Sequence, residues 1–200
     1  MHATVRQMRT TLELKQMVFK GVALVTGAAR GIGKAISLRL AHDGFKVAIN
    51  DISTKTKMLD SVVEEMKAKG QVSSAHVADV TVEDEVRGII KGVVDTHGRL
   101  DVMVANAGVA SYTPLLQLGL DEWERIMKIN AQGVFLCYKH AAVEFGPHGI
   151  TVNAYAPGAI DTEMLSATMT DDTPHEVLID EESKFITGQS ISVNGGVYFD

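Results

Sequence analysis

Cysteine is almost absent from this chain of 200 residues, which contains only Cys137. One cysteine cannot form a disulfide within the chain, and it cannot build a thiolate metal cluster. We therefore expect no metal site, and the composition fits a reducing compartment such as the cytoplasm.

Long apolar runs and clusters of basic residues are also missing. The longest apolar stretches, residues 21–25 and 102–105, are far shorter than the roughly 20 residues that span a bilayer. The formal net charge is −6, and the 19 Lys and Arg residues are scattered along the chain. Such a chain offers no basic surface, so neither nucleic acid nor a membrane is an expected partner.

The length and the 46% share of hydrophobic residues predict one domain with a sizeable core. We assign residues 20–200 to this domain and residues 1–19 to an N-terminal arm or extension. The arm carries basic and hydroxyl side chains and lacks the apolar centre of a signal peptide. Met17, just before the first expected strand, is a plausible alternative start.

Short apolar, β-branched runs alternate with segments of helical period along the domain. Ile32, Ile36 and Leu40, for example, recur four residues apart and give a helix one apolar face. This alternation is typical of an α/β fold with a parallel, doubly wound sheet. The expected strands are residues 22–26, 46–50, 72–80, 100–106, 150–155 and 190–194.

A glycine-rich turn follows the first expected strand, where residues 26–33 read T-G-A-A-R-G-I-G and run straight into a helix. Gly27 allows a tight turn, while Gly31 and Gly33 let the backbone approach a pyrophosphate and let the helix approach the sheet. The helix N-terminus offers N–H donors to the anion. A plain structural turn gives the same pattern, so the context has to decide.

Asp51 closes the second expected strand, 18 residues after Gly33. A carboxylate there can accept hydrogen bonds from the hydroxyls of an adenosine ribose, which favours NAD. The alternative is an aspartate that caps a helix or a turn. Arg30, inside the glycine turn, could pair with a 2′-phosphate, so NADP is the alternative cofactor.

These motifs together resemble the short-chain dehydrogenase/reductase family of Rossmann-like proteins. The glycine turn matches its T-G-x-x-x-G-x-G motif, Asp79 and Val80 match its adenine-contacting pair, and residues 106–108 match its N-A-G strand end. Each motif lies at the carboxyl end of an expected strand, where open α/β sheets bind ligands. The resemblance implies these cofactor contacts: Gly27, Arg30, Gly31, Ile32, Gly33, Asp51, Asp79, Val80, Asn106, Ala107 and Gly108.

The resemblance continues downstream, so it covers about residues 20–200 with interruptions. Asn130 resembles the helix asparagine with which the family holds a water in its proton relay; the alternative is a buried asparagine that bonds its own helix backbone. Residues 153–158 resemble the family's N-x-x-x-P-G segment. This implies four more cofactor contacts: Pro157, Gly158, Ile160 and Thr162.

The chain departs from the family where the catalytic residues should be. The family uses a serine at the end of its fifth strand and a Tyr-x-x-x-Lys on the next helix, and neither is present. Residues 137–142 resemble the helix before that strand, and residues 143–149 resemble the end of the helix after it. The fold is therefore expected to be shortened by one βα unit, through a splice variant, a wrongly assigned exon boundary or a decayed paralogue.

Two functions stay open, besides an unstable fragment with none. The family resemblance implies an oxidoreductase that transfers a hydride between NAD(P) and a small ketone or secondary alcohol. The missing residues point instead to a protein that binds the cofactor without turnover, because Tyr138, Tyr155, His140 and His148 are poor substitutes for the lost acid. A homo-oligomer is expected to be weakened, since the family's interface helices are here joined into one.

Overall fold

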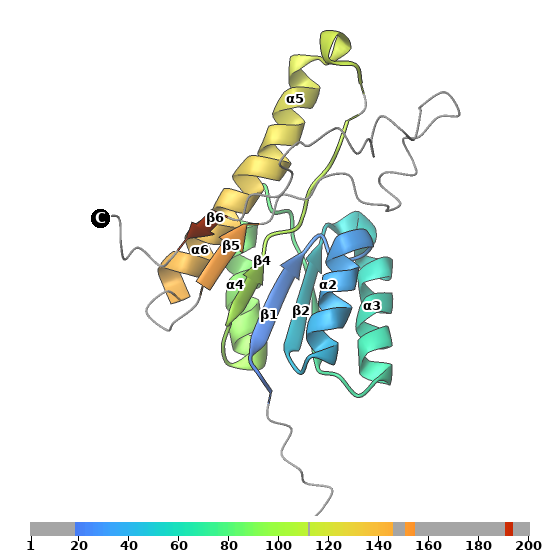
Figure 1. The fold of residues 1–200 in the computed structure, drawn as a ribbon, viewed down its shortest axis with the longest axis vertical. Helices are drawn as coiled ribbons and strands as arrows, with labels where there is room; N and C mark the ends of the chain where they lie inside the picture. Colours follow the sequence, from blue (N-terminus) through green and yellow to red (C-terminus); the bar gives the residue numbers. More distant parts are fainter. Residues whose placement is uncertain (1–18, 112, 146–150, 155–190, 194–200) are drawn as a thin grey trace, which may run out of the picture.

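A mostly parallel sheet of six strands organises the molecule (Figure 1). The computed structural model describes residues 19–111, 113–145, 151–154 and 191–193. The strand order is β3-β2-β1-β4-β5-β6. The strands are β1 Val22–Thr26, β2 Lys46–Asp51, β3 Ser73–Val77, β4 Val102–Val104, β5 Thr151–Ala154 and β6 Ile191–Val193.

Helices cover both faces of this sheet, as expected for a doubly wound fold. On one face α2 and α3 pack over Val25, Val47 and Ile49, and on the other face α4 and α6 pack over Leu24 and Ala48. The helices are α2 Gly31–His42, α3 Thr56–Ala68, α4 Glu83–His97, α5 Leu120–Met127 and α6 Val134–Phe145. None of the described helices is long and apolar enough to cross a membrane.

The strand pairing decides whether the fifth strand fills the slot beside the fourth or leaves a gap there. β5 pairs in parallel with β4, with Thr151 opposite Val102 and Val152 opposite Met103. It thus occupies the slot next to β4 and leaves no gap there. β5 therefore takes the position beside β4 that the strand of the missing βα unit would occupy.

The sixth strand differs from the expected parallel arrangement, because β6 runs antiparallel to β5. A strand's pattern of side chains has the same period in either direction, so it does not encode polarity. Two parallel strands need a crossover connection between them, whereas two antiparallel strands can be joined at the same edge of the sheet. Several strands are also shorter than expected: residues 72–80 yield only Ser73–Val77, because the chain leaves the ladder after Val77.

One continuous run of helix lies between the fourth and the fifth strand in the chain. α5 leads through a π-helical stretch, Lys128–Gly133, into α6 without a break. Ala142 and Val143, between which we expect the family's βα unit to be missing, are consecutive residues within α6. The helix continues to Phe145, as the joining of two half-helices predicts, and residues 146–149 of the second half lie outside the described residues. α5 itself buries no residue among the described ones and rises away from the sheet (Figure 1).

Two histidines share one hydroxyl between β3 and the end of α4. Ser74 Oγ lies 2.9 Å from His76 Nε2 and 2.8 Å from His97 Nε2. A hydroxyl can accept an N–H from one ring and donate its O–H to the other, and the ring that accepts the O–H must be neutral. Burial lowers the pKa of both histidines, with a further lowering of His76 by His97 and of His97 by Lys46.

We predict that this cluster makes the fold sensitive to mild acid. Because the folded pKa values lie below the ordinary 6.5, the unfolded chain takes up protons first, so stability is full above pH 6.5 and falls as the pH drops below it. The carboxyl groups of Glu65, Glu83 and Glu122 titrate below this window, because hydrogen bonds from basic side chains hold their pKa values under 4.5.

Urea denaturation between pH 5 and 7.5 measures this effect, and His97→Gln should flatten the dependence on pH. The exposed His42 supplies the control, since His42→Gln should leave the slope unchanged. Equal slopes for the wild type and His97→Gln would contradict the prediction.

Candidate functional site

The carboxyl ends of the first four strands carry the predicted site residues to one edge of the sheet. β1 leads into the glycine turn, β2 ends at Asp51, β3 leads to Asp79 and β4 leads to Asn106. Parallel strands in the order β3-β2-β1-β4 place all four ends side by side. This is the edge at which open α/β sheets bind ligands.

Three glycines fit the turn after β1 for different reasons. Gly27 and Gly31 have φ values of +63° and +53°, which side chains rarely adopt. A Cβ on Gly33 would lie 2.3 Å from Gly27 O and 2.6 Å from Asn106 Nδ2, so this position tolerates no side chain. A Cβ on Gly31 would meet nothing within 4 Å, which shows that the surface above this glycine is open.

The N-terminus of α2 faces this open surface. The residue before the helix, Arg30, is in an extended conformation, and no side chain caps the helix. The first N–H groups of a helix have no partner within it, so those of Gly31, Ile32 and Gly33 are available to an anion. Arg30 itself is exposed.

Asp51 is half-buried and faces the glycine turn. Ala29 donates its backbone N–H to Asp51 Oδ2 at 3.1 Å, and Ile52 donates its own to Oδ1 at 2.9 Å. These two bonds fix the carboxylate, and each oxygen keeps a further lone pair. Asp51 therefore does stabilise the turn, as the alternative interpretation of its position predicts. The remaining lone pairs of its carboxylate suit ribose hydroxyls.

Asp79 and Val80 follow β3 and are held from both sides. Asp79 Oδ1 accepts the backbone N–H of Thr81 at 2.8 Å, and the Asp79 N–H donates to Glu85 Oε2 at 2.7 Å. Val80 is buried against Gly133, where a Cβ would come within 2.8 Å of Val80 Cγ2. The Val80 side chain is therefore a packing group, a role that the sequence motif does not reveal.

Asn106 and its neighbours close the junction between β1 and β4. Asn106 Nδ2 donates to the carbonyls of Thr26 at 2.9 Å and of Gly27 at 3.3 Å. The backbone N–H groups of Asn106 and Ala107 both donate to Thr26 Oγ1 at 3.0 Å. Thr26, whose hydroxyl is buried, was not among the predicted site residues, although its place before Gly27 in the motif was a signal for it. Gly108 lies at the exposed end of this segment.

Asn130 lies in the π-helical stretch and holds the loop after β4. Its Oδ1 accepts the N–H of Val109 at 2.9 Å, and its Nδ2 donates to the Val109 carbonyl at 2.8 Å. The residue is exposed, so the alternative of a buried asparagine bonding its own helix is wrong. The side chain keeps one donor and one acceptor position that a water could use.

The residues considered as substitutes for the missing acid are directed elsewhere or lie outside the described residues. Lys139 Nζ and His140 Nε2 both contact Glu83 Oε1, at 2.7 and 2.9 Å. Burial, together with Cys137, raises the pKa of Tyr138, which makes it a poorer acid. Burial also raises the pKa of Cys137 to about 12. The predicted residues outside the described part of the chain are His148, Tyr155, Pro157, Gly158, Ile160 and Thr162.

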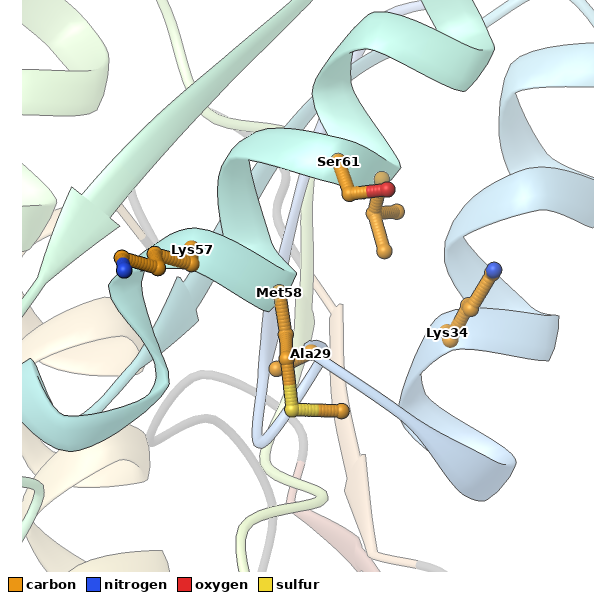
Figure 2. Close-up of a pocket in the computed structure, with 6 residues that line it drawn as sticks. Ala29, Lys34, Lys57, Met58 and Ser61 are labelled. Carbon is orange, nitrogen blue, oxygen red and sulfur yellow. The ribbon is translucent and has the colours of Figure 1, made fainter.

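A cavity of about 260 Å³ lies beside the glycine turn, between α2 and α3 (Figure 2). Lys34 lines it from α2, Met58 and Ser61 line it from α3, and Ala29 lines it from the glycine turn. Lys34 Nζ is already paired with Glu65 at 3.0 Å. The cavity lies beside the hydrogen bond between Asp51 and Ala29. The Lys34 ammonium does not by itself make the cavity an anion site, because Glu65 already neutralises it.

Sequence comparison shows a consistent set of relatives. The sequence model of the short chain dehydrogenase family matches residues 21–143. The short-chain dehydrogenase/reductase eriH of Hericium erinaceus is 33% identical over 248 positions, which take in 90% of this chain and 98% of eriH. A 3-oxoacyl-acyl-carrier-protein reductase of Staphylococcus epidermidis is 35% identical over 241 positions, with coverages of 88% and 98%. Both alignments are longer than the 200 residues of the chain, so they include positions that this chain leaves empty.

Structural comparison agrees over a shorter span. A metagenomic short-chain oxidoreductase in complex with NADP superposes with a TM-score of 0.60 and 32% sequence identity. The match covers 65% of this chain and 58% of the solved one. The chain thus corresponds to little more than half of that structure.

The close approach at Gly33 yields a stability prediction. Gly33→Ala should lower the free energy of unfolding by about 1–3 kcal/mol, because the new methyl group overlaps the Gly27 carbonyl and the Asn106 amide. Gly88→Ala, inside α4 with nothing within 4 Å, is the matched control and should stabilise by about 0.5–1 kcal/mol. Urea denaturation compares the two variants, and equal effects would refute the proposed crowding.

Proposed function

Because the chain belongs to the short-chain dehydrogenase family, we propose that it binds a nicotinamide dinucleotide at the carboxyl edge of its sheet. The observation that carries this proposal is the arrangement of the glycine turn, the uncapped N-terminus of α2 and the Asp51 carboxylate around one open surface. When bound, such a cofactor supplies or accepts a hydride. The parent activity is the interconversion of a small carbonyl compound and a secondary alcohol.

The described residues fit this cofactor. The open space above Gly31 and the unpaired N–H groups of α2 suit a pyrophosphate. Asp51 keeps acceptor positions for ribose hydroxyls, and Asp79 stands at the neighbouring strand end, where an adenine amino group could reach it. Thr26 and Asn106 hold the floor of the site by four hydrogen bonds within the described region.

We favour NAD over NADP on the position of Asp51. Its carboxylate, fixed by Ala29 and Ile52, would repel a 2′-phosphate and accept hydrogen bonds from a free ribose. The opposing feature is Arg30, an exposed guanidinium in the glycine turn, which suits a 2′-phosphate. The solved relative with NADP shows that the family also uses that cofactor.

Proton chemistry is the part that this chain lacks. Reduction of a ketone needs an acid for the developing alkoxide, and the family's tyrosine, lysine and serine have no counterpart in the sequence. Asn130 is a remnant of the relay, since its side chain keeps one donor and one acceptor position that a water could use. Lys139 and His140 are committed to Glu83, so they do not replace the missing acid.

The second candidate function is therefore cofactor binding without turnover. The continuity of α6 across Ala142 and Val143 favours it, because a βα unit inserted there would interrupt this helix. The alignments with relatives, which are longer than the chain, also support a missing segment. For either function we propose a cytoplasmic protein without nucleic acid or membrane as partner, and a weakened homo-oligomer.

We predict that the folded chain binds NADH and discriminates against NADPH. Asp51→Ala should remove most of this preference, because the variant loses both the ribose acceptor and the repulsion of a 2′-phosphate. Calorimetric titration with both cofactors measures the change, and Asp60→Ala, an exposed carboxylate on α3, is the control. No heat with either cofactor from folded protein would remove both candidate functions.

We also predict that the chain as it stands does not turn over carbonyl compounds or alcohols at an enzymatic rate. A strand-and-helix segment from a relative, bearing the serine and Tyr-x-x-x-Lys, can be inserted between Ala142 and Val143. Restored acid catalysis should raise the rate by at least about 10²–10⁴-fold on a panel of ketones and secondary alcohols. Equal rates for both versions, with Tyr155→Phe abolishing the activity of the original, would show that Tyr155 is the acid.

A further inference from the structure

Asn50 is a buried polar residue that the family motifs do not include. It precedes Asp51 in β2 and is 1% exposed. Core positions of a parallel strand are usually apolar, as Val47, Ala48 and Ile49 are in the same strand. A buried amide at this position therefore needs a reason.

The side chain of Asn50 joins β2 to the chain that leaves β3. Asn50 Nδ2 lies 3.0 Å from the His76 carbonyl and 3.1 Å from the Ala78 carbonyl. Its two N–H bonds can serve these two acceptors, and the Asp51 carbonyl at 3.4 Å is a weaker third. The contact with Ala78 reaches past the last residue of β3.

The backbone of Asn50 also contacts the glycine turn. Its carbonyl accepts the N–H of Ala28, in the glycine turn, at 2.9 Å. The adjacent Asp51 carbonyl accepts the N–H of Ala78 at 3.1 Å. One residue thus connects the glycine turn, the strand end that carries Asp51 and the segment that leads to Asp79.

This connection matters because the regular ladder between β2 and β3 ends at Asp51 and Val77. Asp79 lies two residues further on, where no strand pairing fixes it. The Asn50 amide and the Asp51 carbonyl together hold Ala78 one step beyond the ladder, so the amide contributes to the position of Asp79 relative to Asp51.

The oxygen of the same side chain shows that this arrangement has a cost. Among the described residues, Asn50 Oδ1 is buried without a hydrogen-bond partner. A buried acceptor without a partner destabilises a fold, and an apolar residue would avoid it. The two hydrogen bonds that the Asn50 amide donates, to the His76 and Ala78 carbonyls, offset this loss of stability.

We propose that Asn50 is a positioning residue for the adenosine half of the cofactor, acting through the placement of Asp79 against Asp51. The proposal rests on the proposed function, since Asp51 and Asp79 are the expected ribose and adenine contacts. The pyrophosphate contacts at the N-terminus of α2 lie on the other side of Asp51 and do not depend on the Asn50 side chain.

The test is calorimetric titration of the full chain and of Asn50→Leu, which keeps the side chain's size and removes its donors. The probes are NADH, AMP and inorganic pyrophosphate. We expect the variant to bind NADH and AMP about tenfold more weakly, by the same factor, and pyrophosphate unchanged. Asn50→Ser, smaller and polar, serves in case Asn50→Leu does not fold, and the same split is expected.

Gln71 provides the matched control. Its side-chain oxygen is likewise buried without a partner among the described residues, but it precedes β3 at the opposite edge of the sheet. Gln71→Leu should leave the affinities for all three probes unchanged. Thermal unfolding of each variant separates loss of stability from loss of binding.

Each outcome decides the question. Unchanged AMP binding by folded Asn50→Leu overturns the positioning role and leaves the proposed function intact. Equal weakening of all three probes also overturns it, because a general distortion would act in this way. If the folded wild-type chain binds neither NADH nor AMP, the proposed function fails, and the role of Asn50 fails with it.

Discussion

The contact of α2 with the turn after β1 is the constraint on which the site depends. With hydrogen alone on Gly33, the first turn of the helix approaches the Gly27 carbonyl and the Asn106 amide closely. That approach aims the helix N-terminus along the carboxyl edge of the sheet. Thr26 completes the joint, because its single buried hydroxyl accepts two backbone N–H groups from the segment after β4. The direction of the helix at the proposed anion site thus depends on one tightly packed junction.

The shortened sheet separates two halves of the family's chemistry. The residues proposed to bind a dinucleotide lie at the strand ends of β1 to β4, and these strands keep their parallel order. The residues that move a proton belong to a unit that the chain does not have. Removal of that unit leaves the first half intact because β5 pairs directly with β4 and α6 continues across the junction. Binding without chemistry is therefore a structurally consistent outcome.

Much of this could be predicted from the sequence, because the motifs are tied to strand ends. The glycine turn, Asp51, Asp79 and Asn106 each follow an apolar run, and the parallel fold then brings them together. The polarity of β6 could not be predicted, since the period of a strand is the same in both directions. The hydrogen bonds of Thr26, Asn50 and Asn130 could not be predicted either, although the place of Thr26 in the motif was a signal that it belongs to the site. These bonds join residues 21 to 81 positions apart, which no local pattern records.

Binding at the carboxyl edge is tested by the backbone amide chemical shifts of the full chain, recorded by NMR with and without NADH. NADH bound there should shift the amides of residues 31–33, of Asp51 and of Asp79, which line the carboxyl edge of the sheet. The amides of Ser74 and His97, away from that edge, should not move. Shifts confined to residues outside the carboxyl edge, or no shifts at saturating NADH, would contradict it.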